Sequence, residues 1–183
     1  KKIRRLKRVK YLIIDVSNQK NVNKRLSKNY DYVVNLAGYV DHSHKTKTMK
    51  SHFNGCKNLA NFFLNTKIKK FLQIGSSIEY GKINSPQIES SKIPKKTHSI
   101  YGDAKLLSTK FLLKLWRKKS FPTTIIRLYL VYGPYQDANR IIPITITNAI
   151  KDKKFDCSEG KQLRDFIFVD DVISAIIKII KSK

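Results

Sequence analysis

The sequence predicts an α/β fold built on a doubly wound parallel sheet. The chain has 183 residues, of which 41% are hydrophobic, and this is enough for one domain with a sizeable core. Short and continuously apolar runs recur along it, as expected for strands that are buried on both faces. Stretches with helical periodicity separate these runs, and this alternation is typical of a parallel sheet with crossover helices.

Four apolar runs are predicted to be the strands. They cover residues 10–15, 31–38, 70–75 and 123–128. The first three end in small or polar residues, as at Asp15. In doubly wound sheets, ligands bind beyond the carboxyl ends of the strands, so we expect these ends to line one crevice.

Two helices and a long loop are predicted between the strands. Residues 48–64 carry apolar side chains at helical spacing, and so do residues 101–118, where Trp116 is expected to face the core. Residues 78–100 are polar, contain prolines and lack a clear period. Such a long irregular segment within a compact domain is typical of a functional loop.

The chain is strongly basic. Its 38 Lys and Arg residues against 13 Asp and Glu residues give a net charge of +25, which raises nucleic acid or an anionic membrane as a partner. The basic residues are scattered and rarely alternate with aromatic ones, which disfavours nucleic acid. No run approaches the roughly 18 apolar residues of a membrane span, so we expect no membrane partner. An anionic small ligand such as a phosphate ester would benefit from the same field.

The cysteine content favours a reducing compartment. Cys56 and Cys157 cannot make a disulfide framework, and we expect both to be small core residues. The basic residues 1–5 are not followed by an apolar signal region, so the cytoplasm is the predicted location. No cysteine or further histidine completes a metal site around residues 41–44, and none is predicted.

One pair of residues carries candidate acid–base chemistry. Tyr101 and Lys105 are four residues apart at the start of a predicted helix and therefore share one face. A lysine there would lower the pKa of the phenol, making Tyr101 a proton donor or acceptor near neutral pH. Ser76 lies at the carboxyl end of the strand 70–75, where its hydroxyl could meet this pair across the crevice.

With these residues the sequence resembles the extended short-chain dehydrogenase/reductases, the NAD-dependent epimerase/dehydratase family that acts on nucleotide sugars. Six motifs occur in the family's order along almost the whole chain, which is far more specific than any one of them. They are Asp15-Val16, Asn35-Leu36-Ala37-Gly38, Gly75-Ser76-Ser77 with Tyr80-Gly81, Tyr101-x-x-x-Lys105, Arg127 with Val131-Tyr132-Gly133-Pro134, and Arg164-Asp165-Phe166-Ile167-Phe168-Val169-Asp170-Asp171.

The resemblance implies a Rossmann-like fold with a catalytic group of Ser76, Tyr101 and Lys105. Tyr101 would be the acid/base, Lys105 would hold the nicotinamide ribose, and Ser76 would bind the reacting sugar oxygen. The implied cofactor-binding residues are Asp15, Val16, Ala37, Gly38 and Tyr129, together with Tyr101 and Lys105. The implied substrate-binding residues are Ser76, Ser77, Leu130 and Arg164. The forked donors of Arg164 suit the substrate diphosphate.

The sequence also departs from the family pattern. The family opens with a Gly-x-x-Gly-x-x-Gly turn that binds the pyrophosphate, and none of the seven glycines here forms it. We interpret the chain as an internal piece that lacks the first βαβ unit. It would hold a partial dinucleotide-binding domain over residues 1–150 and the beginning of a small substrate-binding region over residues 151–183. The cofactor, NAD or NADP, stays open, and the resemblance implies a homodimer formed through the helices 48–64 and 101–118.

The resemblance narrows the reaction without fixing it. In the family's 4,6-dehydratases an acidic residue follows the Ser/Thr by one or two positions, whereas here Ser77 and Ile78 follow and Glu79 comes one position late. We therefore expect an NAD(P)-dependent nucleotide-sugar 4-epimerase or 4-keto reductase, in which Tyr101 moves the hydroxyl proton and the cofactor moves the hydride. The alternatives are a dehydratase of the same family, or a non-catalytic basic module that binds nucleic acid or acts as a scaffold.

Overall fold

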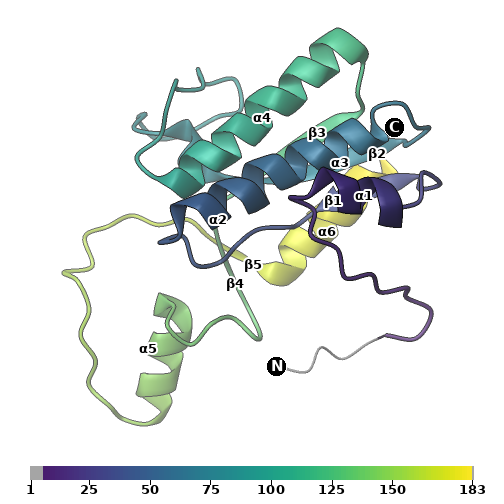
Figure 1. Cartoon of the computed structure of the whole chain (residues 1–183). Helices are drawn as coiled ribbons and strands as arrows, with labels where there is room; N and C mark the ends of the chain where they lie inside the picture. Colours follow the sequence, from purple (N-terminus) through teal and green to yellow (C-terminus); the bar gives the residue numbers. More distant parts are fainter. Residues whose placement is uncertain (1–5, 183) are drawn as a thin grey trace. The chain divides into compact units, whose positions relative to one another are not determined.

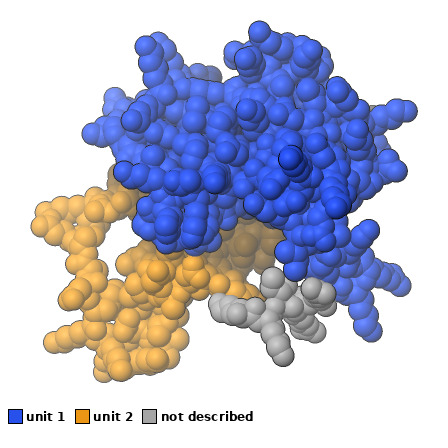
Figure 2. Space-filling model, in the orientation of Figure 1, with its two compact units in different colours: residues 1–127 blue, residues 128–183 orange. Residues whose placement is uncertain are grey.

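A computed structural model describes residues 6–182 of the chain. It divides into two compact units, one reaching to Arg127 and the other beginning at Leu128 (Figure 2). The boundary between residues 150 and 151, which was predicted to separate the dinucleotide-binding domain from the substrate-binding region, stays a prediction. Residues 1–5, on which the predicted cytoplasmic location partly depends, lie outside the described residues.

The first unit is built on a sheet of three strands, β1 (Tyr32–Asn35), β2 (Lys70–Ser76) and β3 (Thr123–Leu128). Their order in the sheet is β1-β2-β3, and β1 pairs with β2 in parallel, with Asn35 opposite Gln73. The amide of Asn35 donates to the amide oxygen of Gln73 at 2.7 Å, so this buried polar pair is satisfied internally. The predicted parallel α/β architecture is confirmed.

The prediction of a strand over residues 10–15 is wrong. This segment has no regular structure, and Leu12 and Ile13 are 41% and 83% exposed. A strand needs a neighbouring strand for its backbone N–H and C=O groups, and neither sheet in the described residues includes this segment. The first regular element is the helix α1 (Gln19–Arg25), which begins at Asn18, whose side chain accepts from the N–H groups of Lys20 and Asn21.

Both predicted helices are present and lie side by side (Figure 1). The first consists of α2 (Lys45–Met49), a π-helical segment η1 (Lys50–Asn54) and α3 (Gly55–Phe63). The second, α4 (Ile100–Lys119), begins at Ser99, whose hydroxyl accepts from the N–H of Gly102. One hydrophobic cluster joins these helices to α1 and β2, and its buried members are Val22, Cys56, Leu59, Ala60, Phe63, Ile68, Phe71, Leu112 and Phe121.

Two expectations about the core are wrong. Trp116 is 54% exposed, because Leu112 and Leu115 take the core side of the last turns of α4 and the next residue is rotated by about 100°. Cys56 is buried as expected, but Cys157 is exposed on a segment without helix or strand. The loop after β2 contains one 3-10 turn, η2 (Ser77–Tyr80), and residues 81–99 form no helix or strand.

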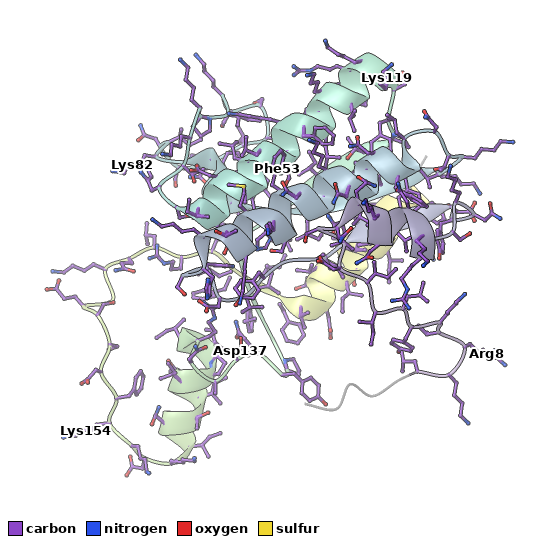
Figure 3. The ribbon with its side chains drawn as sticks, viewed as in Figure 1. Arg8, Phe53, Lys82, Lys119, Asp137 and Lys154 are labelled. Atoms are coloured by element: carbon purple, nitrogen blue, oxygen red, sulfur yellow. The ribbon has the colours of Figure 1, made fainter. Side chains whose placement is uncertain are left out.

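The positive charge is spread over the surface. Figure 3 shows the side chains of Lys82 and Lys119 at separate places on the first unit. Within residues 6–182, Lys105 is the only buried lysine. Lys105 therefore stands apart from the other described lysines by its burial.

The second unit contains a parallel pair of strands, β4 (Leu130–Tyr132) and β5 (Phe166–Phe168), with the helices α5 (Ile141–Ile150) and α6 (Val169–Lys181). Val172 is its only buried residue in the part that the structure describes. Across residues 6–182, none of the helices has both the length and the apolar character needed to cross a membrane.

Candidate active site

Ser76, Tyr101 and Lys105 lie together in the first unit. Ser76 is the last residue of β2, and the other two lie on the first turns of α4. The side chain of Ser76 is hydrogen-bonded to that of Tyr101. Lys105 Nζ lies 5.8 Å from the centre of the Tyr101 ring and donates to the backbone oxygen of Ile74 at 2.6 Å. A hydroxyl, a phenol and an ammonium group thus converge at the carboxyl end of β2.

The direction predicted for the pKa of Tyr101 is wrong. Burial raises the pKa of this phenol, the hydrogen bond from Ser76 opposes that rise, and the charge of Glu79 adds to it. Burial also lowers the pKa of Lys105, while the charges of Glu79 and Cys56 oppose this. Lys105 directs its ammonium group to the oxygen of Ile74, and desolvation of the phenol outweighs any help from it.

Two histidines contact Tyr101, and neither contact was predicted from the sequence. The ring of His42 stacks on Tyr101 with centres 4.1 Å apart and planes 14° apart, and His52 meets it edge-on at 5.0 Å. His52 Nε2 lies 3.2 Å from the backbone oxygen of Tyr39. Burial and then the charge of Lys105 lower the pKa of His52 to about 4, so it is neutral at physiological pH. These contacts join residues far apart in the chain, which local patterns cannot reveal.

Val16, one of the predicted cofactor-binding residues, lies against α3. Asn58 on α3 donates to the backbone oxygens of Val16 at 3.0 Å and Ser17 at 2.9 Å. A Cβ atom added at Gly55 would lie 3.0 Å from Val16 Cγ2, so this glycine allows the close approach. Asp15 is exposed, and its Oδ1 accepts from both the N–H and the hydroxyl of Ser17.

Ala37 and Gly38 follow the end of β1. The N–H of Ala37 donates to Asn35 Oδ1 at 3.1 Å. A Cβ atom at Gly38 would overlap the ring of His52, so any larger residue would displace that ring. Gly38 thus packs against His52 of η1, and Val16 packs against Gly55, the first residue of α3.

Glu79 is a further residue of this site. From the sequence, only its distance from Ser76 along the chain enters the prediction, as a test for a dehydratase. Its side chain is buried, and its two oxygens accept from Ser76 N–H at 2.8 Å and from Thr109 Oγ1 at 2.6 Å. Arg127 Nε lies 3.3 Å from Oε2. The spacing Ser76-x-x-Glu79 is that of a capping box, a signal from which the first contact could have been predicted.

The remaining predicted residues belong to the second unit. Leu130 and Arg164 line a cavity of about 730 Å³, together with residues of α5, β5 and the segment 155–163. Arg164 is exposed, and its Nη2 donates to Gln162 Oε1 at 2.6 Å. Tyr129 is half-buried between β3 and β4, and Ser77 in the first unit opens η2.

The chain belongs to the NAD dependent epimerase/dehydratase family, whose sequence model matches residues 1–183. It is 28% identical over 117 residues to dTDP-D-glucose 4,6-dehydratase of Homo sapiens, which covers 63% of this chain and 33% of that protein. The chain therefore spans about a third of that relative's length.

Two solved structures share the fold. UDP-glucose 4-epimerase of Thermotoga maritima, with UDP-glucose, superposes with a TM-score of 0.82 and 22% identity over 92% of this chain and 58% of that one. A UDP-glucuronic acid 4-epimerase mutant of Bacillus cereus, in complex with NAD and a fluorinated UDP-sugar, gives a TM-score of 0.79 and 24% identity over 91% of this chain and 55% of that one. The Rossmann-like fold is thereby confirmed, and NAD is the cofactor bound in the second structure.

Proposed function

We propose that this chain carries the catalytic group of an NAD-dependent nucleotide-sugar 4-epimerase or 4-keto reductase. The observation that carries the proposal is the convergence of Ser76, Tyr101 and Lys105 at the end of β2. Membership of the NAD dependent epimerase/dehydratase family supports the reaction type. The cavity lined by Leu130 and Arg164 supports a substrate with an anionic diphosphate.

The residues of the site fit the nicotinamide half of the cofactor. Lys105 presents a buried cation beside Tyr101, and an ammonium of this kind can donate to ribose hydroxyls. Beyond the end of β1, Ala37 has a small side chain and Gly38 has none. The sequence holds no glycine-rich turn for the pyrophosphate. NAD, when bound, supplies the hydride chemistry that no side chain can provide.

The chain's own part in the reaction is proton transfer and orientation. Ser76 would hold the sugar's C4 oxygen by a hydrogen bond, since its side chain interacts with that of Tyr101. Tyr101 would take the proton of that hydroxyl on oxidation and return it on reduction. Lys105 would stabilise the phenolate form during transfer by its charge, as any cation near a developing anion does.

The environment of Glu79 favours epimerisation or reduction over dehydration. A dehydratase needs an acid to protonate the departing hydroxyl group. Glu79 is the acidic residue closest in sequence to Ser76, and both its oxygens are engaged by Ser76, Thr109 and Arg127. A carboxylate whose two oxygens both accept from groups of the protein is not free to approach a substrate.

The test uses the protein expressed from its complete coding sequence, in D₂O, either with NAD and, in turn, UDP-glucose, UDP-glucuronic acid and dTDP-glucose, or with NADH and a 4-keto nucleotide sugar. We expect C4 epimers in the first case or 4-hydroxy products in the second, without deuterium at C5. A dehydratase would instead lose the C5 hydrogen on eliminating water across C5 and C6 and take up deuterium at C5 when hydride returns to C6. Tyr101→Phe should lower turnover by about 10² to 10⁴-fold. Tyr30→Phe, a change at an exposed residue, is the control. Full activity of Tyr101→Phe would exclude the proposed role.

A further inference from the structure

Glu79 is a buried carboxylate that proton transfer by Tyr101 does not itself require. It is 1% exposed, in the 3-10 turn that follows β2. Burying a charge is costly unless it is paired and hydrogen-bonded, so a carboxylate in this place needs compensating contacts.

Donors from three elements provide these contacts. Ser76 N–H comes from the end of β2, the Thr109 hydroxyl from the middle of α4, and Arg127 Nε from β3. The guanidinium group of Arg127 in turn lies 4.7 Å from the centre of the Tyr80 ring. The carboxylate therefore ties the strand that ends at Ser76 to the helix that carries Tyr101.

The strand makes room for this carboxylate. A Cβ atom added at Gly75 would lie 2.5 Å from Glu79 Oε1 and 3.1 Å from the backbone oxygen of Ile126. Any side chain at position 75 would displace the oxygen that holds Ser76 N–H. Gly75 and Glu79 thus form one arrangement that sets the backbone of Ser76.

The charge of Glu79 also acts on the reactive groups. It adds to the rise in the pKa of Tyr101, and it opposes the fall in the pKa of Lys105 that burial causes, although Arg127 lies beside it. It raises the pKa of the Cys56 thiol on α3 as well, although burial is the main cause there. The ionisable groups on which its charge acts are Arg127, Tyr101, Lys105 and Cys56, and Tyr80 lies against Arg127.

We propose that Glu79 is a positioning residue of the active site, which fixes the backbone of Ser76 at the end of β2 and whose negative charge acts on Tyr101 and Lys105. This inference rests on the proposed function for its catalytic consequence. Its electrostatic part concerns the free protein alone and can be measured without a substrate.

Three variants of the full-length protein separate the two roles. Glu79→Gln removes the charge and keeps an oxygen that can accept from Ser76 N–H. Glu79→Asp keeps the charge and shortens its reach. Thr109→Val removes one of the two donors to Oε2, leaves that of Arg127, and is the matched control, because it weakens the hydrogen bonding of the same carboxylate without changing its charge.

The first measurement is the titration of Tyr101, followed by NMR of ¹³Cζ-labelled tyrosine and assigned with Tyr101→Phe. In Glu79→Gln the midpoint should fall, and in Thr109→Val it should not move. The second is the pH profile of kcat, whose limb for Tyr101 should shift in the same direction in Glu79→Gln. In Glu79→Asp, kcat should fall by about 10-fold with the titration near that of the wild type, because Ser76 loses its acceptor.

Unchanged titration of Tyr101 in folded Glu79→Gln would overturn the electrostatic role, and wild-type kcat in Glu79→Asp would overturn the positioning role. If Glu79→Gln fails to fold, Glu79→Asp still tests the positioning role. If the wild type turns over none of the nucleotide sugars, the proposed function fails, and the titration still decides the role of the charge.

Discussion

The two units differ in what supports their functional residues. In the unit that reaches to Arg127, Ser76, Tyr101 and Lys105 rest on a hydrophobic cluster drawn from α1, α3, α4 and β2. In the unit that begins at Leu128, Leu130 and Arg164 line a cavity, and Val172 is the only buried residue among those described. Chemistry needs groups fixed within fractions of an ångström, whereas binding can draw on adaptable segments.

This difference predicts where mutations will be felt. Changes in the first unit should alter stability and kcat, because its packing fixes the reactive groups. Changes around the cavity should alter KM, because residues 151–165 form no helix or strand that would hold the lining in advance.

The largest effect on stability is expected at Phe71, which is fully buried in β2. Phe71→Ala should lower the free energy of unfolding by about 3–5 kcal/mol, through lost burial and the cavity left behind. Phe166→Ala in β5 is the matched change, because Phe166 is 39% exposed, and it should cost about 1 kcal/mol.

Denaturant unfolding followed by the fluorescence of Trp116, the protein's single tryptophan, measures the first change in the unit that contains it. Circular dichroism follows the whole chain and measures the second. If Phe71→Ala and Phe166→Ala lower the free energy of unfolding equally, the two units do not differ in packing as inferred here.

The next effect is a dependence of stability on pH in the first unit. The pKa of His52 is lowered from 6.5 to about 4, mainly by burial, so the unfolded chain binds a proton between these values that the folded protein excludes. Stability therefore falls as the pH falls through this window, by about 3 kcal/mol once it is complete.

His52→Asn should flatten the stability between pH 4 and 6.5, and His98→Asn, at an exposed histidine, should not. The measurement is a series of denaturant midpoints across this range. An unchanged slope in His52→Asn would mean that the acid sensitivity arises elsewhere.

Much of this architecture could be predicted from local patterns. The runs that became β1, β2 and β3 and the helix over residues 100–119 follow from apolar spacing and from the cap at Ser99. The run 10–15 has the same apolar character, yet it forms no strand, because pairing depends on a neighbour and not on the run itself.

Some features of the candidate site could likewise be predicted from local patterns, and others could not. The spacing of Tyr101 and Lys105 predicts a shared helix face, and Ser76-x-x-Glu79 carries the signal of a capping box. The stacking of His42 on Tyr101 and the rise in the pKa of Tyr101 depend on tertiary burial. No pattern within a few residues contains that information.

The smallest predicted effect tests the second unit alone. Arg164→Lys keeps a positive charge and removes the forked donors that can hold two oxygens of a diphosphate at once. KM for the nucleotide sugar should rise about 10-fold, equivalent to about 1.4 kcal/mol, with kcat unchanged. Arg140→Lys, at another exposed arginine of the same unit, is the control and should change neither constant. A fall in kcat at constant KM would place Arg164 among the groups that act on the transition state, and the division between a unit for chemistry and a unit for recognition would then fail.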